Sequence, residues 1–377
     1  MDERIQLFSK KQIYNHEDTD TLFLRAVKKN VAYHAKNCQE YRNILKKRGF
    51  SFKQLSTIED LHQIPPIPTL YLKTHHLISK PLKCMLIKAT SSGTKGIKSQ
   101  VGFDLSSLYY GFHMVKNIAL THKLFSIKPT NYIMLGYKPN KSNSAIIAKT
   151  AFGATFLAPA IRRKYALDFK EGEYQLDLTG LKKALLSYCQ QPYPVRIIGF
   201  PAYLYFLLLD IKKTCKKGGK FSPLKLHPDS MIFLGGGWKQ FYQEKVEKER
   251  LYDLVHEVLG IKEANIREFF GAAEHPIVYC DCKNHHFHVP AFSRVIIRDV
   301  TTLLPVGYDK VGLMNLVTPM MDSLPLVSVM TDDLAVLHEG KECGCGLKTP
   351  YFEVIGRVGV QDIKTCAQGA EKMLRGE

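Results

Sequence analysis

Apolar residues recur along the chain in two patterns, one with helical spacing and one typical of buried strands. Helical spacing predicts helices over residues 21–48, 202–212 and 249–259. Apolar runs bounded by Gly or Pro predict strands over residues 132–135, 195–198 and 231–234. Because these strands alternate with helices, the pattern predicts an α/β fold with a largely parallel sheet.

The pattern changes after Phe287, where short apolar segments follow one another without long helical stretches between them. These segments predict strands at residues 295–297, 313–317 and 326–329. We therefore expect a β-rich subdomain to close the fold. Much earlier, Pro65, Pro66 and Pro68 interrupt regular structure.

The chain has 377 residues, 45% of them hydrophobic, which suffices to bury a large core as one big domain or two. It has no apolar run of about 18 residues or more, so we expect no membrane span. Residues 1–6 lack the basic and apolar regions of a signal peptide, which predicts a cytoplasmic protein. The nine cysteines are then expected to be thiols or metal ligands rather than disulfides.

The formal net charge of +18 bears on the kind of partner. Basic clusters are scattered along the chain and accompany no recognised nucleic-acid-reading motif, so nucleic acid is not the expected partner. A basic, non-catalytic nucleic-acid-binding protein is kept as a rival class. Nucleotides, coenzyme A or an acidic protein partner suit the same charge.

A loop rich in hydroxyl groups is the most informative segment. It comprises Thr90, Ser91, Ser92, Gly93, Thr94, Lys95 and Gly96. Hydroxyls and backbone N–H groups on a tight loop suit phosphate, and glycine allows close approach. The spacing is not that of a P-loop, and composition alone favours an ordinary surface turn.

Three further candidates lie at or near the ends of predicted strands, where α/β folds place ligands. Gly235, Gly236 and Gly237 follow the strand at residues 231–234, although such a triplet also serves as a simple connecting turn. Glu274 comes shortly after the strand-like residues 267–270, and Asp332 after those at 326–330. The alternative for Glu274 is an exposed turn carboxylate, and the alternative for Asp332 is a capping aspartate.

The order of these motifs, together with Phe270–Glu274 and Gly356-Arg357, resembles that of adenylate-forming enzymes. Within that superfamily the chain is most similar to LuxE-type acyl-protein synthetases, over nearly its whole length. The resemblance implies the α/β large N-terminal domain of adenylate-forming enzymes with a β-rich closing subdomain, over residues 1–357. Residues 358–377 would form a short tail, and the mobile C-terminal domain of other members would be missing.

The resemblance also implies roles for individual residues. ATP or AMP would be bound by Thr90, Ser91, Ser92, Gly93, Thr94, Gly235, Gly236, Gly237, Phe270, Gly271, Ala272, Asp332 and Arg357. Glu274 would hold Mg²⁺, Asp332 would accept the ribose hydroxyls, and Lys95 or Lys98 would replace the adenylation lysine of the missing domain. Cys366 would take the acyl group as a thioester, because a thiolate is a strong nucleophile near neutral pH.

The function implied is ATP-dependent activation of a carboxylic acid, expected to be a fatty acid, to acyl-AMP, followed by transfer to a protein thiol. An acyl reductase or an acyl-carrier protein would be the partner. An acyl- or aryl-CoA ligase of the phenylacetate type is the alternative, and the missing mobile domain argues against it. The residues do not identify the acid.

Two C-x-C pairs suggest a metal: Cys280 with Cys282, and Cys343 with Cys345. Four thiolates suit a closed, tetrahedral and structural Zn²⁺ site, although C-x-C is tighter than the usual spacing. His285, His286 or His288 could replace one thiolate. Four unrelated cysteines are the alternative. His288 could also belong to the acyl site, because His288-Val289-Pro290 recurs in LuxE-type sequences.

Overall fold

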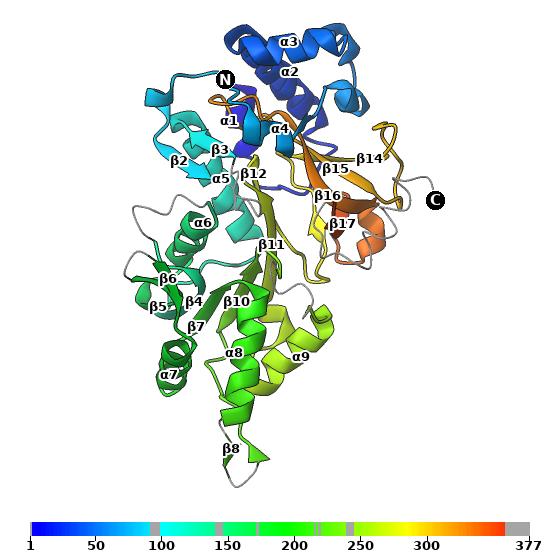
Figure 1. Cartoon of the computed structure of the whole chain (residues 1–377). Helices are drawn as coiled ribbons and strands as arrows, with labels where there is room; N and C mark the ends of the chain where they lie inside the picture. Colours follow the sequence, from blue (N-terminus) through cyan, green and yellow to red (C-terminus); the bar gives the residue numbers. More distant parts are fainter. Residues whose placement is uncertain are drawn as a thin grey trace. The chain divides into compact units, whose positions relative to one another are not determined.

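The computed structural model describes residues 2–90, 99–139, 146–170, 173–214, 216–217, 220–238 and 245–358. The chain divides into two compact units (Figure 1). Unit 1 comprises Met1–His122 and Gly271–Glu377, and unit 2 comprises Lys123–Phe270. Among the described residues, we find no helix with both the length and the apolar character needed to cross a membrane.

Unit 2 is built on a largely parallel sheet, as predicted. Its strands follow the order β11-β10-β7-β4-β5-β6. They are β4 (Thr130–Tyr137), β5 (Ala160–Lys170), β6 (Glu173–Leu176), β7 (Val195–Gly199), β10 (Met231–Gly235) and β11 (Ile266–Ala272), whose last two residues belong to unit 1. β4, β5, β7, β10 and β11 are parallel to their neighbours, and β6 is antiparallel to β5.

Helices connect these strands and bury one face each against them. They are α6 (Ile146–Ala154), α7 (Leu178–Tyr188), α8 (Pro201–Thr214) and α9 (Lys248–Leu259). Two short 3₁₀ turns (Thr155–Leu157 and Glu263–Asn265) and the small hairpin of β8 (Lys216–Lys217) and β9 (Lys220–Phe221) are the remaining elements among the described residues of this unit. α8 and α9 pack against each other (Figure 1), and Leu208 and Val255 are fully buried in their common core. The predicted helices at 202–212 and 249–259 are thus confirmed.

The N-terminal part of unit 1 is mainly helical. It contains α1 (Glu3–Phe8), α2 (Asp20–Asn37), α3 (Gln39–Lys47), α4 (Thr69–Thr74), the hairpin of β2 (Ile87–Thr90) and β3 (Gln100–Phe103), α5 (Leu105–Thr121), and 3₁₀ turns at Phe52–Gln54, Glu59–Gln63 and Leu82–Cys84. The single helix predicted over 21–48 is wrong in one respect, because it breaks at Cys38. That residue takes an extended conformation (φ −125°, ψ 106°), while the apolar spacing resumes beyond it.

The C-terminal part of unit 1 is the expected β-rich segment. Its sheet follows the order β13-β17-β16-β15-β14, and β1 pairs in parallel with β16. The strands are β1 (Ile67–Pro68), β13 (Phe287–His288), β14 (Arg294–Arg298), β15 (Gly312–Val317), β16 (Ser328–His338) and β17 (Tyr351–Arg357); β12 (His275–Cys280) precedes them, and a 3₁₀ turn spans Gly340–Cys343. β16 runs well beyond the predicted 326–329 because it pairs with β17 along most of its length.

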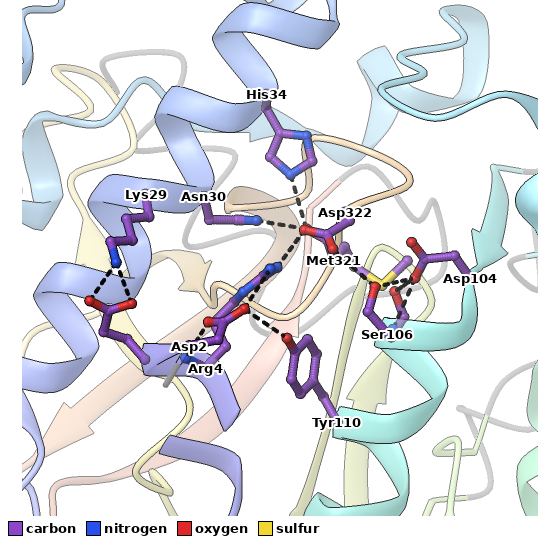
Figure 2. A network of polar contacts seen from close by, with 12 residues as sticks. Asp2, Arg4, Lys29, Asn30, His34, Asp104, Ser106, Tyr110, Met321 and Asp322 are labelled. Carbon is purple, nitrogen blue, oxygen red and sulfur yellow. Dashed lines mark hydrogen bonds and ion pairs between the residues drawn. The ribbon is translucent and has the colours of Figure 1, made fainter. Parts of the chain in front are cut away.

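A polar network fastens the N-terminal helices of unit 1 to the loop before β16 (Figure 2). The Asp322 carboxylate pairs with Arg4 of α1 and accepts a hydrogen bond from Ser106 of α5 (2.9 Å). From α2, His34 Nε2 and Asn30 Nδ2 both donate to the Met321 carbonyl, at 3.0 and 2.8 Å. The loop that leads into β16 is therefore held from three helices at once.

Candidate functional site

The carboxyl edge of the parallel sheet in unit 2 carries the predicted glycine turn. Because β4, β7, β10 and β11 are parallel, their carboxyl ends meet at one edge. Gly235 ends β10, and Gly236 and Gly237 follow with φ of 79° and 64°. A Cβ on Gly236 would lie 2.7 Å from both Phe200 and Ile147, whereas one on Gly237 would meet no atom of the described residues within 4 Å. The turn thus packs tightly at Gly236 and is open at Gly237.

Strand β11 carries the next predicted group. Phe269 pairs with Gly235 of the neighbouring strand β10, so the next residue, Phe270, lies beside the glycine turn. Gly271 and Ala272 end the strand. Glu274 lies in the tight turn between β11 and β12 and is only 6% exposed, so it is not the exposed turn carboxylate that composition alone would favour.

A second acidic group lies on β16 of unit 1. Asp332 and Asp333 both stand inside this strand, where its pairing with β15 shifts register between Met330 and Leu334. Asp333 is opposite Arg357 of β17, and the Arg357 Nε lies 3.4 Å from the Asp333 Oδ1. The Asp332 carbonyl accepts the N–H of Val358 at 2.7 Å. The structure thus brings Arg357 to the strand that carries both aspartates.

Asp333 is the residue that the sequence analysis left without a role. Its side chain is 15% exposed, and burial raises its pKa above the usual value, although Arg357 acts in the opposite direction. Asp332 and Glu274 contribute to the rise, which puts Glu274 within electrostatic reach of Asp333. No signal in the linear sequence separates the two aspartates, because the pairing of Asp333 with Arg357 depends on the register of β16 with β17.

Several predicted residues fall outside the described part of the chain. These are Ser91, Ser92, Gly93, Thr94, Lys95 and Lys98 of the hydroxyl-rich loop, and Cys366. Thr90 is described and ends β2, directly before that loop. The roles expected for these residues, and for the glycine turn, stay predictions.

A compact cluster of potential metal ligands lies in unit 1. Ligand atoms of Cys282, His288, Cys343 and Cys345 all lie within 4.8 Å of one another. The set differs from the four cysteines expected, because His288 is a member and Cys280 is not. Cys280 is the last residue of β12, and its thiol contacts the carbonyl of Asp281 at 3.6 Å. Burial, with hydrogen bonds between its thiol and those of Cys345 and Cys282, raises the pKa of Cys343 to about 12.

Sequence comparison identifies two similar curated proteins and one family. The long-chain-fatty-acid–luciferin-component ligase of Vibrio harveyi is 25% identical over 366 residues, covering 94% of this chain and 89% of that protein. The protein of the same name from Aliivibrio fischeri is 23% identical over 373 residues, covering 95% and 90%. The model of the family "Acyl-protein synthetase, LuxE" matches residues 3–374.

Solved structures with the same fold are ligases. 2-Hydroxyisobutyryl-CoA ligase in an open conformation, in complex with 2-HIB-AMP and CoA, matches with a TM-score of 0.66 and 14% identity, covering 93% of this chain and 72% of that one. The same enzyme in its postadenylation state matches with a TM-score of 0.65 and 15% identity, covering 92% and 70%. At these identities the likeness concerns the fold alone, and it confirms the adenylate-forming architecture. Since the family model spans almost all of its residues, the chain belongs to the LuxE family of acyl-protein synthetases.

Proposed function

We propose that this protein activates a long-chain fatty acid with ATP and transfers the acyl group to the thiol of Cys366. The observation that carries the proposal is the match of the acyl-protein synthetase family over residues 3–374. The two curated relatives, which are named as fatty-acid ligases, support the choice of acid. A CoA ligase would have the same fold, but no observation favours that activity specifically.

In the first step a carboxylate oxygen of the acid attacks the α-phosphorus of ATP. The new acyl–phosphate bond replaces the α–β phosphoanhydride bond, and pyrophosphate leaves. Such a reaction depends on positioning and on cations beside the phosphoryl oxygens. Lys95 and Arg357 are the cations proposed here. The glycine turn and Phe270 are proposed to hold adenine, and Asp332 the ribose hydroxyls.

Glu274 is the residue proposed to hold Mg²⁺. Its carboxylate is buried just beyond the end of β11, and Mg²⁺ commonly takes one or two carboxylate ligands. Bound there, Mg²⁺ would neutralise charge on the phosphates. Asp333 is proposed as a positioning residue, because its ion pair orients the guanidinium of Arg357.

In the second step the thiolate of Cys366 attacks the acyl carbonyl of the adenylate. A carbon–sulfur bond forms, the bond to AMP breaks, and the thiol proton passes to solvent. The product is a thioester that a partner consumes, and an acyl reductase or acyl-carrier protein suits this chemistry. The protein is also proposed to contain a structural Zn²⁺, expected to stabilise unit 1 rather than take part in either step.

Acyl transfer is tested by incubating the purified protein with ATP and a radiolabelled fatty acid. We expect a label on the protein that hydroxylamine releases, as it does from a thioester. Cys366→Ser should abolish the label and leave acid-dependent pyrophosphate exchange intact. Cys84→Ser, which alters an exposed cysteine outside the proposed site, is the matched control and should label like the wild type. Equal labelling of Cys366→Ser, or stoichiometric consumption of CoA, would overturn the transferase proposal in favour of a ligase.

A further inference from the structure

We infer that Cys282, His288, Cys343 and Cys345 bind one Zn²⁺ ion in a closed tetrahedral site, and that Cys280 takes no part in it. The inference concerns the stability of unit 1 and does not depend on the acyl-transfer proposal. Three thiolates and one imidazole are among the ligand sets that structural zinc sites use. Four protein ligands leave no open position for a substrate or a reactive water.

The distances between the ligand atoms suit this ion. Zn–S bonds of about 2.3 Å and Zn–N bonds of about 2.0–2.1 Å give a tetrahedron with edges of roughly 3.5–3.8 Å. The Cys282 and Cys343 sulfurs are 3.5 Å apart, and His288 Nε2 lies 3.2 Å from the Cys345 sulfur. A disulfide would need about 2.05 Å between sulfurs, so the first distance fits a shared ion better than a covalent bond.

The tautomer of His288 is set for metal binding. Its ring is fully buried, and Nδ1 lies 2.7 Å from the carbonyl oxygen of Thr349. Because a carbonyl only accepts hydrogen bonds, Nδ1 carries the proton and Nε2 keeps its lone pair. That lone pair is on the side of Cys345. A metal-bound histidine commonly donates its other N–H to such an acceptor, which fixes the ring orientation.

Backbone groups around the sulfurs favour thiolates. The N–H of Asn284 donates to the Cys282 sulfur (3.3 Å), and the N–H of Leu347 donates to the Cys345 sulfur (3.4 Å). Hydrogen bonds to an ionised acceptor are stronger than those to a neutral one. The Asn284 side chain also donates to the Cys343 carbonyl at 2.6 Å, so the two cysteine-bearing turns are already joined beside the site.

His286 is close to the site but lies outside the cluster of four ligand atoms. Its Nδ1 is 3.2 Å from the Cys343 sulfur, while its ring stacks on Tyr351 at 4.4 Å and its Nε2 is 3.6 Å from Glu353. These contacts engage both ring nitrogens and one face of the ring. We therefore assign His286 the role of a hydrogen-bond donor to the Cys343 thiolate rather than that of a ligand.

The site joins segments that are far apart in sequence. Cys282 and Cys343 are separated by 61 positions. One segment contains β13, which pairs with β17, and the other leads into β17. An ion at this point would fix the edge of the sheet and the strand that ends in Arg357. Its loss should therefore weaken unit 1 from this edge.

The experiment measures metal content and stability of the full chain, produced without a histidine tag. Elemental analysis should find about one zinc per chain in the wild type, in Cys280→Ser and in His286→Ala. Cys345→Ser and the double variant Cys343→Ser/Cys345→Ser should lose it and melt at lower temperature, since metal binding is coupled to folding. His288→Ala should lower zinc affinity at least a hundredfold.

Cobalt substitution keeps the test independent of variants that fail to fold. Wild-type protein stripped of metal and loaded with Co²⁺ should show the d–d bands of a tetrahedral site and the sulfur charge transfer expected of three thiolates. Zinc retained at full stoichiometry by the double variant would overturn the assignment. Three other results would also overturn it. They are a loss of zinc from Cys280→Ser as complete as that from Cys345→Ser, a wild type that neither contains nor binds zinc, and an octahedral cobalt spectrum.

Discussion

At the scale of single residues, β16 separates two neighbouring carboxylates into different environments. The Asp333 side chain is 15% exposed and pairs with Arg357, whereas Asp332 is joined to the end of β17 through its carbonyl, which accepts the N–H of Val358. The sequence analysis chose Asp332 from its position in the chain, and nothing in the linear order marks Asp333 as different. The distinction depends on the register with β17, which is a long-range property. Both residues therefore belong in any test of the nucleotide site.

The pair Asp333→Asn and Asp332→Asn tests these roles by acid-dependent pyrophosphate exchange. Asp333→Asn should lower kcat/KM for ATP about tenfold or more, because loss of a charge-assisted contact costs about 1.5–3 kcal/mol and about 1.4 kcal/mol is tenfold. Asp332→Asn should raise KM for ATP with a smaller change in kcat, if it contacts the ribose. Unchanged exchange in Asp333→Asn would show that the ion pair does not position Arg357.

Acid sensitivity is expected from His34. Burial lowers its pKa from the ordinary 6.5 to about 4, and its Nε2 donates to Met321 while Nδ1 lies 2.7 Å from the Ser79 hydroxyl. Because the pKa of His34 is lower in the folded than in the unfolded protein, the neutral ring makes its full contribution to stability at pH values above 6.5. That stability is lost as pH falls from 6.5 to 4, by about 1.4 kcal/mol per unit.

Urea titrations between pH 7 and 4.5 measure this loss. His34→Gln keeps an amide that can donate to Met321 but cannot titrate. The unfolding free energy of His34→Gln should therefore fall less steeply with decreasing pH than that of the wild type. Around pH 5 the two slopes should differ by the uptake of close to one proton on unfolding. His16 and His275 are buried with pKa values lowered to about 3 and titrate in both proteins. Parallel slopes for the two proteins would contradict the role given to His34.

At the scale of elements, Gly236 illustrates how a turn at a strand end is constrained from two sides. Its φ of 79° favours glycine, and Phe200 and Ile147 occupy the space of a Cβ. Gly236→Ala should cost about 1–3 kcal/mol in unfolding free energy and weaken protection by ATP against thermal unfolding.

Gly237→Ala is the matched control for this turn, because its φ is also positive but no atom in the described part of the chain lies within 4 Å of its Cβ position. We expect a smaller loss, about 1–2 kcal/mol, from the backbone conformation alone. Equal losses in denaturant titrations of the two variants would show that packing at Phe200 and Ile147 contributes nothing.

Periodic segments of the sequence predicted several elements of the core because their burial is local information. Strands β4, β7 and β10 and helices α8 and α9 are confirmed for this reason. The break at Cys38 could not be predicted, since the apolar spacing continues on both sides of it. The cluster of potential metal ligands contains His288 and not the expected Cys280. This difference also depends on where β12 ends, which the C-x-C spacing does not specify.

At the scale of the whole molecule, the order of motifs was more informative than any one of them. Each of the glycine turn, Glu274 and Asp332 has an ordinary structural explanation when taken singly. Their order predicted the adenylate-forming fold and the LuxE family, and both are confirmed. The roles of the residues are not decided by this agreement, because a shared fold supports more than one acyl acceptor.

The measurement that tests the central claim most directly is ATP–pyrophosphate exchange by the purified protein with a series of fatty and aromatic acids. We predict exchange that requires both Mg²⁺ and a long-chain fatty acid, and that falls at least a hundredfold in Glu274→Gln while the melting temperature without ATP changes little. Absence of acid-dependent exchange, with the protein alone and with a partner reductase present, would contradict the account. Salt-sensitive nucleic-acid binding in its place would favour the basic binding protein.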